Sequence, residues 1–462
     1  MPPAPPLDTG NLWRYAALGL PLALPTVAVY VLLPTWYFET FGLPLTLIGA
    51  ILLLTRLLDV LTDPLIGIFI DRFPGIKPAR LIFGAGLICA PSLLLLVNPW
   101  QQNASLSLLL GLLFLYLGWT LIQIPYLAWL PRLHGDSHQR NRAASARETM
   151  TIAGLVISAA LPLGATLAGL NLQQGLNLLV GITVLAGLVA IRALWGLPYA
   201  AATGQKATPY ASSWRLFQHN RLALRLLSAW FLNGLANGFP AVLFPLFVSA
   251  WLGGSEQTRA LYILLYFGAA ILSLPLWLFM SRYITRARLW CLAMIAAISA
   301  FALAPLLSPA TALGFVPICL VTGAALGADL TLPHVLQAEV SDWDRYRFGQ
   351  ERNGILFACW NMATKLALAL SAGFAFVLLG ASGFESDNAE PLWLLGLIYA
   401  GLPCVFKGVA VLLLWNFPLQ SGHHRAIRHR LARRLRSLHA HEPDSAVTAD
   451  QPLPCRMHRH EN

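Results

Sequence analysis

Three ionisable side chains lie inside a stretch that otherwise has the composition of a membrane helix. The stretch runs from Leu45 to Ile70, and the three residues are Arg56, Asp59 and Asp63. On a helix they fall at i, i+3 and i+7, in one stripe with roughly 6 Å between neighbouring side chains. An Asp or Arg at the centre of a bilayer costs about 2.5 to 3.5 kcal/mol. The stripe is therefore expected to face a protein-lined interior rather than lipid.

The charges of this stripe do not balance within the helix. Arg56 neutralises one of the two carboxylates, which leaves about one negative charge over. An excess carboxylate in the interior of a membrane protein is a natural binding site for Na⁺ or H⁺. The alternative is an Arg–Asp clamp that holds helices together without binding an ion, and the pattern alone leaves both interpretations open.

Composition identifies the chain as a polytopic membrane protein. Of its 462 residues, 57% are hydrophobic and 11% are charged, against about 25% charged in soluble domains. The net charge of +11 comes mostly from Lys and Arg in alternate connections and in the tail. That placement follows the positive-inside rule, predicts both termini in the cytoplasm, and argues against nucleic acid as a partner. The basic run HHRAIRHRLARRLRS is expected to meet anionic lipid of the inner membrane.

Apolar runs long enough to cross a bilayer recur twelve times. They predict an all-α fold of two six-helix bundles, in which a polar central connection separates the halves. The predicted spans are 15–38, 45–70, 79–98, 105–130, 148–170, 176–197, 222–250, 260–281, 287–307, 311–336, 353–380 and 391–416. The predicted organisation is a cytoplasmic segment 1–14, a bundle 15–197, a cytoplasmic loop 198–221, a second bundle 222–416, and a basic, disordered cytoplasmic tail 417–462.

Several classes of chemistry have no motif here. The six cysteines are scattered, and no pair has the spacing of a metal site or of a disulfide framework. No phosphate-binding loop or catalytic motif is visible, so ATP-driven pumping is not expected, and neither is a resident cofactor or metal.

Motifs in the second and eleventh spans resemble those of the glycoside-pentoside-hexuronide:cation symporters, a family within the major facilitator superfamily whose type member is melibiose permease. The second span contains RLLDVLTDPLIG, and AEVSDWDRYRFGQERNG precedes the eleventh span, which carries Lys365. The connection after the second span begins GIFIDR, as in the wider superfamily. The resemblance runs from about Gly19 to Gly380.

The resemblance implies a cation site and a neighbouring solute site. Asp59 and Asp63 match the two cation-binding aspartates, Thr62 stands where a polar ligand is common, and Thr120 matches a hydroxyl of the fourth span. Arg147 matches an arginine that helps bind sugar, and Lys365 matches a lysine near both sites.

Two departures from the family pattern concern the solute. The aspartate that grips sugar hydroxyls in the first span falls at Ala23, and its counterpart in the fourth span falls at Gln123, which remains a candidate solute ligand. The tryptophan that follows it falls at Leu127. Because Ala and Leu cannot accept hydrogen bonds from vicinal hydroxyls, galactoside transport is doubtful, and a lysolipid or other amphipathic solute is an alternative.

Further polar residues in the second half are candidates for the solute site. Asp329 is expected either to pair with Lys365 or to bind solute, and Lys407 to pair or snorkel. Trp360 and Asn361 lie about one turn before Lys365 and are expected to line the cavity. Four residues of the basic connections are expected to act as cytoplasmic gate residues rather than ligands: Asp71, Arg72, Asp342 and Arg352.

The sequence thus predicts a monomeric Na⁺- or H⁺-coupled symporter of a small organic solute, which works by rocking of two bundles. Two other classes remain open. One is a membrane-embedded, lipid-modifying enzyme that uses Asp59, Asp63 and Asp329 as acid and base, although no nucleophile accompanies them. The other is a non-transporting sensor whose output is the basic tail.

Overall fold

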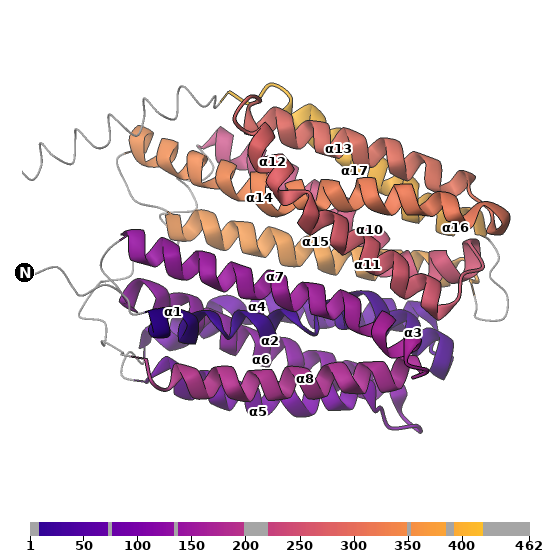
Figure 1. Ribbon diagram of the computed structural model, residues 1–462, viewed down its shortest axis with the longest axis horizontal. Helices are drawn as coiled ribbons and strands as arrows, with labels where there is room; N and C mark the ends of the chain where they lie inside the picture. Colours follow the sequence, from indigo (N-terminus) through magenta and orange to yellow (C-terminus); the bar gives the residue numbers. More distant parts are fainter. Residues whose placement is uncertain are drawn as a thin grey trace, which may run out of the picture.

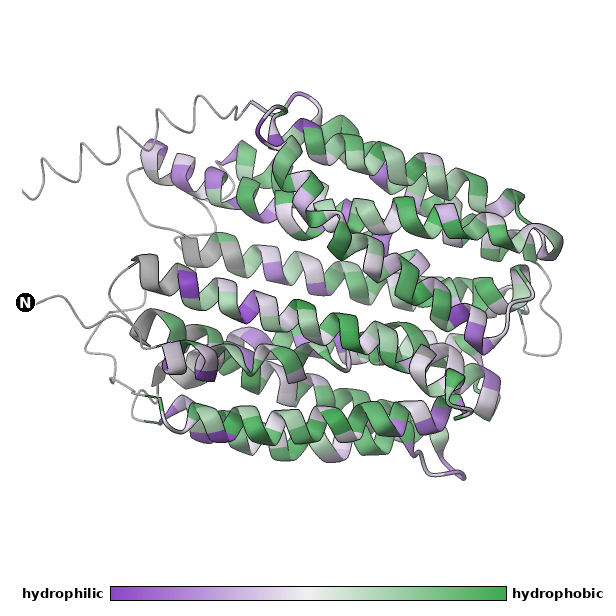
Figure 2. Ribbon diagram, viewed as in Figure 1, coloured by the Kyte–Doolittle hydropathy of each residue, from purple (hydrophilic) through white to green (hydrophobic). Residues whose placement is uncertain are grey.

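The computed structural model consists of helices that run side by side along one axis (Figure 1). It describes residues 9–72, 76–133, 137–197, 220–348, 353–384 and 392–418. Twelve helices or helix runs in these ranges are long and apolar enough to cross a membrane, which confirms the predicted number of spans. Figure 2 shows helices that are mainly hydrophobic along their length, so the chain is a multi-pass membrane protein.

The first six spans form one bundle, drawn from indigo to magenta in Figure 1. Its helices are α1 (Thr9–Ala16), α2 (Gly19–Ala23), the π-helix η1 (Ala28–Leu32), α3 (Leu33–Phe41), α4 (Leu45–Arg72), α5 (Pro78–Val97), α6 (Ala104–Leu133), α7 (Ser137–Leu167) and α8 (Leu172–Leu194).

The last six spans form the second bundle. Its helices are α10 (Arg221–Leu246), η2 (Phe247–Trp251), α11 (Glu256–Leu272), α12 (Leu274–Met280), α13 (Arg286–Leu303), η3 (Ala304–Leu306), η4 (Pro309–Gly314), α14 (Phe315–Phe348), α15 (Asn353–Ala381), α16 (Leu392–Gly396), η5 (Leu397–Gly401) and α17 (Leu402–Leu414).

Helix ends differ from the predicted spans where charged residues continue a helix. The first helix begins at Thr9, inside the segment predicted to precede the bundle. Helix α7 begins at Ser137 instead of near 148, and α14 continues to Phe348 instead of ending near 336. The charged sequence SDWDRYRF is therefore helical. Asp and Arg are tolerated in a helix as well as in a loop once the chain has left the hydrocarbon layer of the bilayer. Residues 198–219 of the central loop and 419–462 of the tail lie outside the described residues.

The first span is broken into four pieces, which follows from its prolines. Pro21 and Pro25 each lack an N–H, and helix α2 ends at Ala23 before a π-helix begins at Ala28. Helix α3 then ends at Phe41 and is followed by Gly42, whose positive φ of 63° suits a residue without a Cβ. By contrast, α6 runs through Pro125 without interruption. The prolines thus interrupt the first span and not the fourth.

The two bundles meet through α4 with α15 and through α7 with α11. Helices α4 and α15 cross closely because glycines face each other: a Cβ on Gly49 would lie 2.9 Å from the Gly373 carbonyl oxygen, and a Cβ on Gly380 would lie 2.6 Å from the Thr46 nitrogen. This glycine crossing lies near the face of the molecule opposite the N-terminus, at the right of Figure 1.

An ion pair closes the same face. One guanidinium nitrogen of Arg259, on α11, donates to both oxygens of Glu39 on α3, at 3.1 and 2.9 Å. The Ser249 hydroxyl donates to the same carboxylate at 3.2 Å. We call Glu39, Ser249 and Arg259 the outer clasp. Together with the glycine crossing, it fixes the bundles to each other at the face opposite the N-terminus.

Candidate functional site

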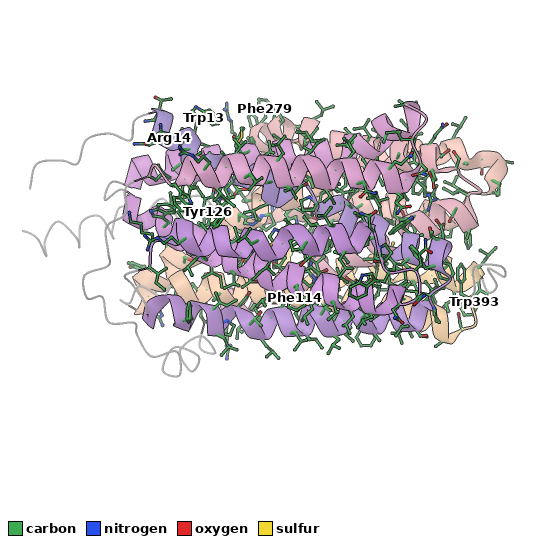
Figure 3. All side chains as sticks on the ribbon, turned by 90° about the horizontal axis from the view of Figure 1, so that it is seen from below. Trp13, Arg14, Phe114, Tyr126, Phe279 and Trp393 are labelled. Atoms are coloured by element: carbon green, nitrogen blue, oxygen red, sulfur yellow. The ribbon has the colours of Figure 1, made fainter. Side chains whose placement is uncertain are left out.

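The stripe of Arg56, Asp59 and Asp63 faces the protein interior. Arg56 and Asp59 are buried, whereas Leu54, Leu61 and Leu65 on other faces of α4 are strongly exposed. The exposed leucines belong to the surface that a bilayer would cover, as do Trp13, Phe279 and Trp393 at the periphery in Figure 3. The helix therefore directs its charges inward and its leucines outward, as the cost of exposing charge to lipid requires.

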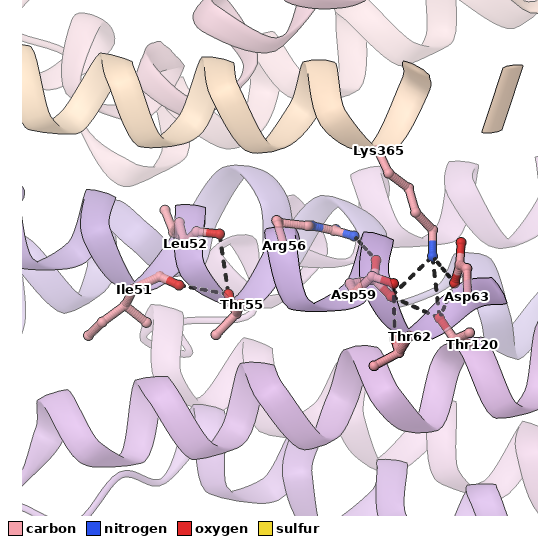
Figure 4. A network of polar contacts seen from close by, with 9 residues as sticks. All are labelled: Ile51, Leu52, Thr55, Arg56, Asp59, Thr62, Asp63, Thr120 and Lys365. Atoms are coloured by element: carbon pink, nitrogen blue, oxygen red, sulfur yellow. Dashed lines mark hydrogen bonds and ion pairs between the residues drawn. The ribbon is translucent and has the colours of Figure 1, made fainter. Parts of the chain in front are cut away.

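A lysine from the second bundle completes the site. The Lys365 ammonium on α15 donates to Asp59 Oδ1 at 3.0 Å, to Asp63 Oδ1 at 2.7 Å and to Thr120 Oγ1 at 3.3 Å (Figure 4). Thr120 in turn donates to Asp59 Oδ1 at 2.8 Å and to Asp63 Oδ1 at 3.1 Å. We call Asp59, Asp63, Thr120 and Lys365 the carboxylate cluster. It joins two helices of one bundle to one helix of the other.

Arg56 binds the second carboxylate oxygen of Asp59. Its Nη1 donates to Asp59 Oδ2 at 3.2 Å, and its guanidinium carbon lies 4.3 Å and 3.8 Å from the ring centroids of Tyr30 and Tyr116. Two aromatic faces attract a desolvated cation and hold it in place. Two cations therefore face two carboxylates, and the excess negative charge expected from α4 alone is neutralised by Lys365.

Thr62 makes a different contact from the other hydroxyl. Its Oγ1 donates to the backbone oxygen of Asp59 at 2.9 Å, one turn earlier on the same helix. Thr120 reaches both carboxylates directly, whereas Thr62 braces the helix that carries them (Figure 4).

The two predicted solute residues of the first bundle lie on α7 and α6. Arg147 on α7 forms an ion pair with Glu148 and lies beside Tyr15 and Tyr126, which exchange hydrogen bonds between hydroxyls and backbone oxygens. Gln123 is exposed on α6, three residues after Thr120. Ala23 stands where the family carries an aspartate, and it packs closely against Gly154 of α7. A Cβ added to Gly154 would lie 2.9 Å from the Ala23 Cβ.

In the second bundle, Asp329 has partners other than Lys365. Its Oδ1 accepts from the Trp290 indole at 2.5 Å, and its Oδ2 accepts from Asn237 at 2.8 Å and lies 3.7 Å from the Lys407 ammonium. Lys407 also donates to Asn233 at 2.7 Å. The expected pairing of Asp329 with Lys365 is therefore wrong, because the carboxylate cluster holds Lys365. Lys407 was expected to pair or to snorkel, and the structure shows it paired with Asp329.

Aromatic rings surround Trp360. Its indole is buried and stacks on Trp230 at 4.4 Å between centroids, while the Trp230 nitrogen donates to Thr364 at 2.7 Å. His334 on α14 lies 5.9 Å from the Trp360 ring and close enough to Glu148 on α7 for their charges to interact. Asn361, the next residue, is exposed. Trp360 is thus packed in the second bundle, and Asn361 is the more accessible of the two.

The predicted gate residues are described in part. Asp71 and Arg72 form the last turn of α4, Asp342 is half-buried on α14, and Arg352 lies outside the described residues. Two neighbouring acids stabilise the end of the second bundle. Asp344 accepts from Asn220 at 2.6 Å, and Glu339 forms an ion pair with Arg286.

Several residues of the site were not predicted. Tyr30 and Tyr116 hold Arg56, and Asn237 and Trp290 bind Asp329. Their sequence signal is weak, because an aromatic or amide residue in an apolar span reads as ordinary core until its neighbours are known. Among the described residues, no group of three or more His, Cys, Asp or Glu side chains is arranged to hold a metal ion.

Relatives are found by sequence. Residues 14–421 match the family described as MFS/sugar transport protein. An uncharacterized symporter of Synechocystis sp., sll1374, is 21% identical over 87% of this chain and 92% of its own. The putative glycoside/cation symporter YagG of Escherichia coli is 32% identical over a shorter region, 29% of this chain and 31% of its own.

Solved structures share the fold. The D-xylose-proton symporter has a TM-score of 0.65 at 14% identity, over 89% of this chain and 98% of its own. The nucleoside transporter NupG has a TM-score of 0.57 at 15% identity, over 89% of this chain and 98% of its own. The matched family and these neighbours are transporters, which overturns the alternative of a lipid-modifying enzyme. The chain belongs to the MFS/sugar transport family of the major facilitator superfamily, as its resemblance to the glycoside-pentoside-hexuronide:cation symporters indicated.

Proposed function

We propose that this transporter is a symporter, in which Na⁺ or H⁺ binds at Asp59, Asp63 and Thr120 and drives the movement of a small organic solute. The observation that carries the proposal is the position of the Lys365 ammonium, which lies 2.7 to 3.3 Å from one oxygen of each of these residues. An ammonium in that place is a positive charge among oxygen ligands, which is the environment that a hard monovalent cation requires.

Lys365 therefore competes with the transported cation. With Arg56 and Lys365 both present, the two carboxylates are fully balanced, and a further cation would add an uncompensated charge to a largely buried site. Entry of the cation requires the ammonium to withdraw. In this conformation the place among the three oxygens is filled by a charge of the protein itself.

This competition couples the site to the movement of the bundles. Lys365 belongs to α15, whereas Asp59 and Asp63 belong to α4, so that exchange of the ammonium for a cation breaks an ion pair between the two bundles. One charge that falls through about 100 mV supplies roughly 2.3 kcal/mol. At about 1.4 kcal/mol per tenfold, that free energy supports roughly fortyfold accumulation of a neutral solute.

The proposed solute site lies between the bundles beside this cluster. Gln123 and Asn361 are its accessible amides, and the Arg147–Glu148 pair lies on α7, a helix that contacts the second bundle. Amide and charged groups of this kind bind hydroxyls and other polar atoms of a sugar-like solute. A relative named as a putative glycoside/cation symporter supports this class, while the packed Ala23 argues against a galactoside. We further propose an inner-membrane location with both termini in the cytoplasm, from the placement of Lys and Arg.

Transport by reconstituted protein tests the proposal. Asp59→Cys and Asp63→Cys are each expected to abolish solute uptake driven by an imposed Na⁺ or pH gradient, measured in proteoliposomes with a panel of sugars and lysolipids. Glu256→Gln is the matched control, since it removes an exposed carboxylate at the start of α11. Gradient-driven uptake that is unchanged in both cysteine variants would refute the coupling role. Uptake of lysolipids but not of sugars would refute a sugar-like solute and assign the transporter an amphipathic one.

A further inference from the structure

An apolar cavity of about 310 Å³ lies inside the first bundle, away from the carboxylate cluster. Its walls come from the broken first span and from α5, α6 and α8. Part of the space is there because Gly187 has no side chain. A Cβ added to Gly187 would have no neighbour closer than the Pro21 Cβ, at 3.9 Å. The wall of α8 thus leaves room at the point where it faces the proline-broken helix.

The cavity is continuous with the outer surface of the bundle. Leu87 on α5 and Leu188 on α8 line it, and 61% and 53% of their surfaces are exposed. Leu87 lies midway along the 20-residue helix α5, at a depth that the hydrocarbon layer of a bilayer occupies. The opening between α5 and α8 therefore faces acyl chains rather than water.

The lining is almost entirely apolar. Its polar side-chain groups are the Thr183 hydroxyl, which donates to the Leu179 oxygen at 2.8 Å, the Cys89 thiol, which contacts the Leu115 oxygen at 3.9 Å, and the Trp119 indole. Apolar cavities stay dry, and one of about 150 Å³ is large enough for a benzene-sized molecule. We propose that the acyl chain of a bilayer lipid enters between α5 and α8 and occupies this cavity.

The acyl chain would contact the aromatic residues that hold Arg56. Trp119 lines the cavity, and its ring lies 6.2 Å from that of Tyr30 and 6.4 Å from that of Tyr116, near-parallel to both. Those two tyrosines flank Arg56, which donates to Asp59. Lipid in the cavity thus supports Trp119 against the tyrosines and keeps Arg56 on Asp59. This second step rests on the proposed function, whereas the lipid site itself does not.

Photocrosslinking tests the site. The probe is a phosphatidylethanolamine with a diazirine in the middle of one acyl chain, in vesicles of phosphatidylethanolamine and phosphatidylglycerol. Crosslinked peptides are expected from the cavity-facing parts of α5 and α8 in the full chain, and Gly187→Leu is expected to reduce them at least fivefold by filling the cavity. Gly181→Leu is the control, since it adds the same side chain on α8 in open space outside the lining. Absent cavity crosslinks, or crosslinks equal in the two variants, would overturn the proposal.

Cation binding by the same two variants tests the second step. Gly187→Leu packs a rigid branched side chain in place of a flexible acyl chain, and its Na⁺ or H⁺ affinity is expected to differ at least threefold from that of Gly181→Leu. Lost crosslinking with equal affinities would retain the lipid site and refute its link to Arg56. Unchanged gradient-driven uptake in the Asp59 and Asp63 variants, by contrast, would refute the proposed function and leave the crosslinking result standing.

Discussion

Each bundle buries an aspartate and a lysine or arginine, but the two arrangements differ in what they connect. In the carboxylate cluster, Lys365 crosses from one bundle to the other, and the side chains of Asp63 and Lys365 keep 27% and 18% of their surface exposed. In the second bundle, Asp329 and Lys407 lie in the same bundle at 5% and 2% exposure, and an amide and an indole also bind the carboxylate. Under the proposed function, the first arrangement exchanges Lys365 for the coupling cation when the bundles move, whereas Asp329 and Lys407 of the second are almost fully buried.

The comparison shows that a buried charge in a membrane helix is not by itself a transport site. The aspartates of both arrangements would be costly to expose to lipid, and in both arrangements basic side chains of the protein neutralise them. What distinguishes them is whether the neutralising charge belongs to the same rigid body. We therefore infer that Asp329 and Lys407 hold α14 and α17 together, and that Asp59 and Asp63 bind the coupling cation.

The largest expected effect is on coupling. Asp63→Asn removes a charge from the partly exposed side of the carboxylate cluster, and gradient-driven uptake is expected to fall at least about 100-fold, or about 2.8 kcal/mol. Because Asp63 is partly exposed, the thermal melting temperature of the detergent-solubilised protein should change little. Strong uptake with a lowered melting temperature would reverse the roles assigned to the two aspartates.

The opposite profile is expected for Asp329→Asn. It leaves the Lys407 charge buried without a counter-charge, which typically costs about 3 to 5 kcal/mol of stability. Melting is expected to shift far downward, and the cation affinity of the folded fraction is expected to stay within twofold of the unaltered protein. The double variant Asp329→Asn with Lys407→Met should recover much of the lost stability, since no buried charge remains. A double variant as unstable as the single one would contradict a pairing role.

Removal of the competing ammonium sharpens the comparison further. Lys365→Met takes away charged hydrogen bonds worth about 1.5 to 3 kcal/mol each, so cation affinity measured by calorimetry is expected to rise about tenfold or more. Lys365→Arg retains the positive charge and is the control. An affinity that falls in the Met variant would show that Lys365 assists cation binding rather than opposes it.

The smallest expected effect concerns the outer clasp. Glu39→Gln removes an ion pair between the bundles that is worth about 1 kcal/mol, enough to change a conformational equilibrium roughly threefold to fivefold. The readout is maleimide labelling of Val31→Cys, a buried position of the first span, which should speed up by that factor. Exchange of the two charges, Glu39→Arg with Arg259→Glu, should restore the slow rate. Equal labelling in all three proteins would mean that the clasp does not bias the conformation.

Much of the fold follows from the sequence, because apolar length and loop charge are local signals. The inward stripe on α4 is predicted by the spacing of Arg56, Asp59 and Asp63 alone. The pairing of Asp329 with Lys365 is wrong because a sequence gives no register between helices, so it cannot show that Lys407 is the lysine beside Asp329. The packing of Arg56 against Tyr30 and Tyr116 is not predictable for the same reason, since the two tyrosines come from the first and fourth spans.

The glycine crossing gives the molecule mechanical leverage. Gly373 and Gly380 press α15 against α4 near one end, and the other end of α15 at Asn353 lies about 30 to 40 Å away at 1.5 Å per residue. A pivot of about 15° at the crossing, a rotation of the size seen between subunits of switching proteins, would swing that distant end by roughly 10 Å. Lys365, only eight residues from Gly373, would travel a fraction of that distance, so a small release at the ion pair becomes a wide opening at the far end.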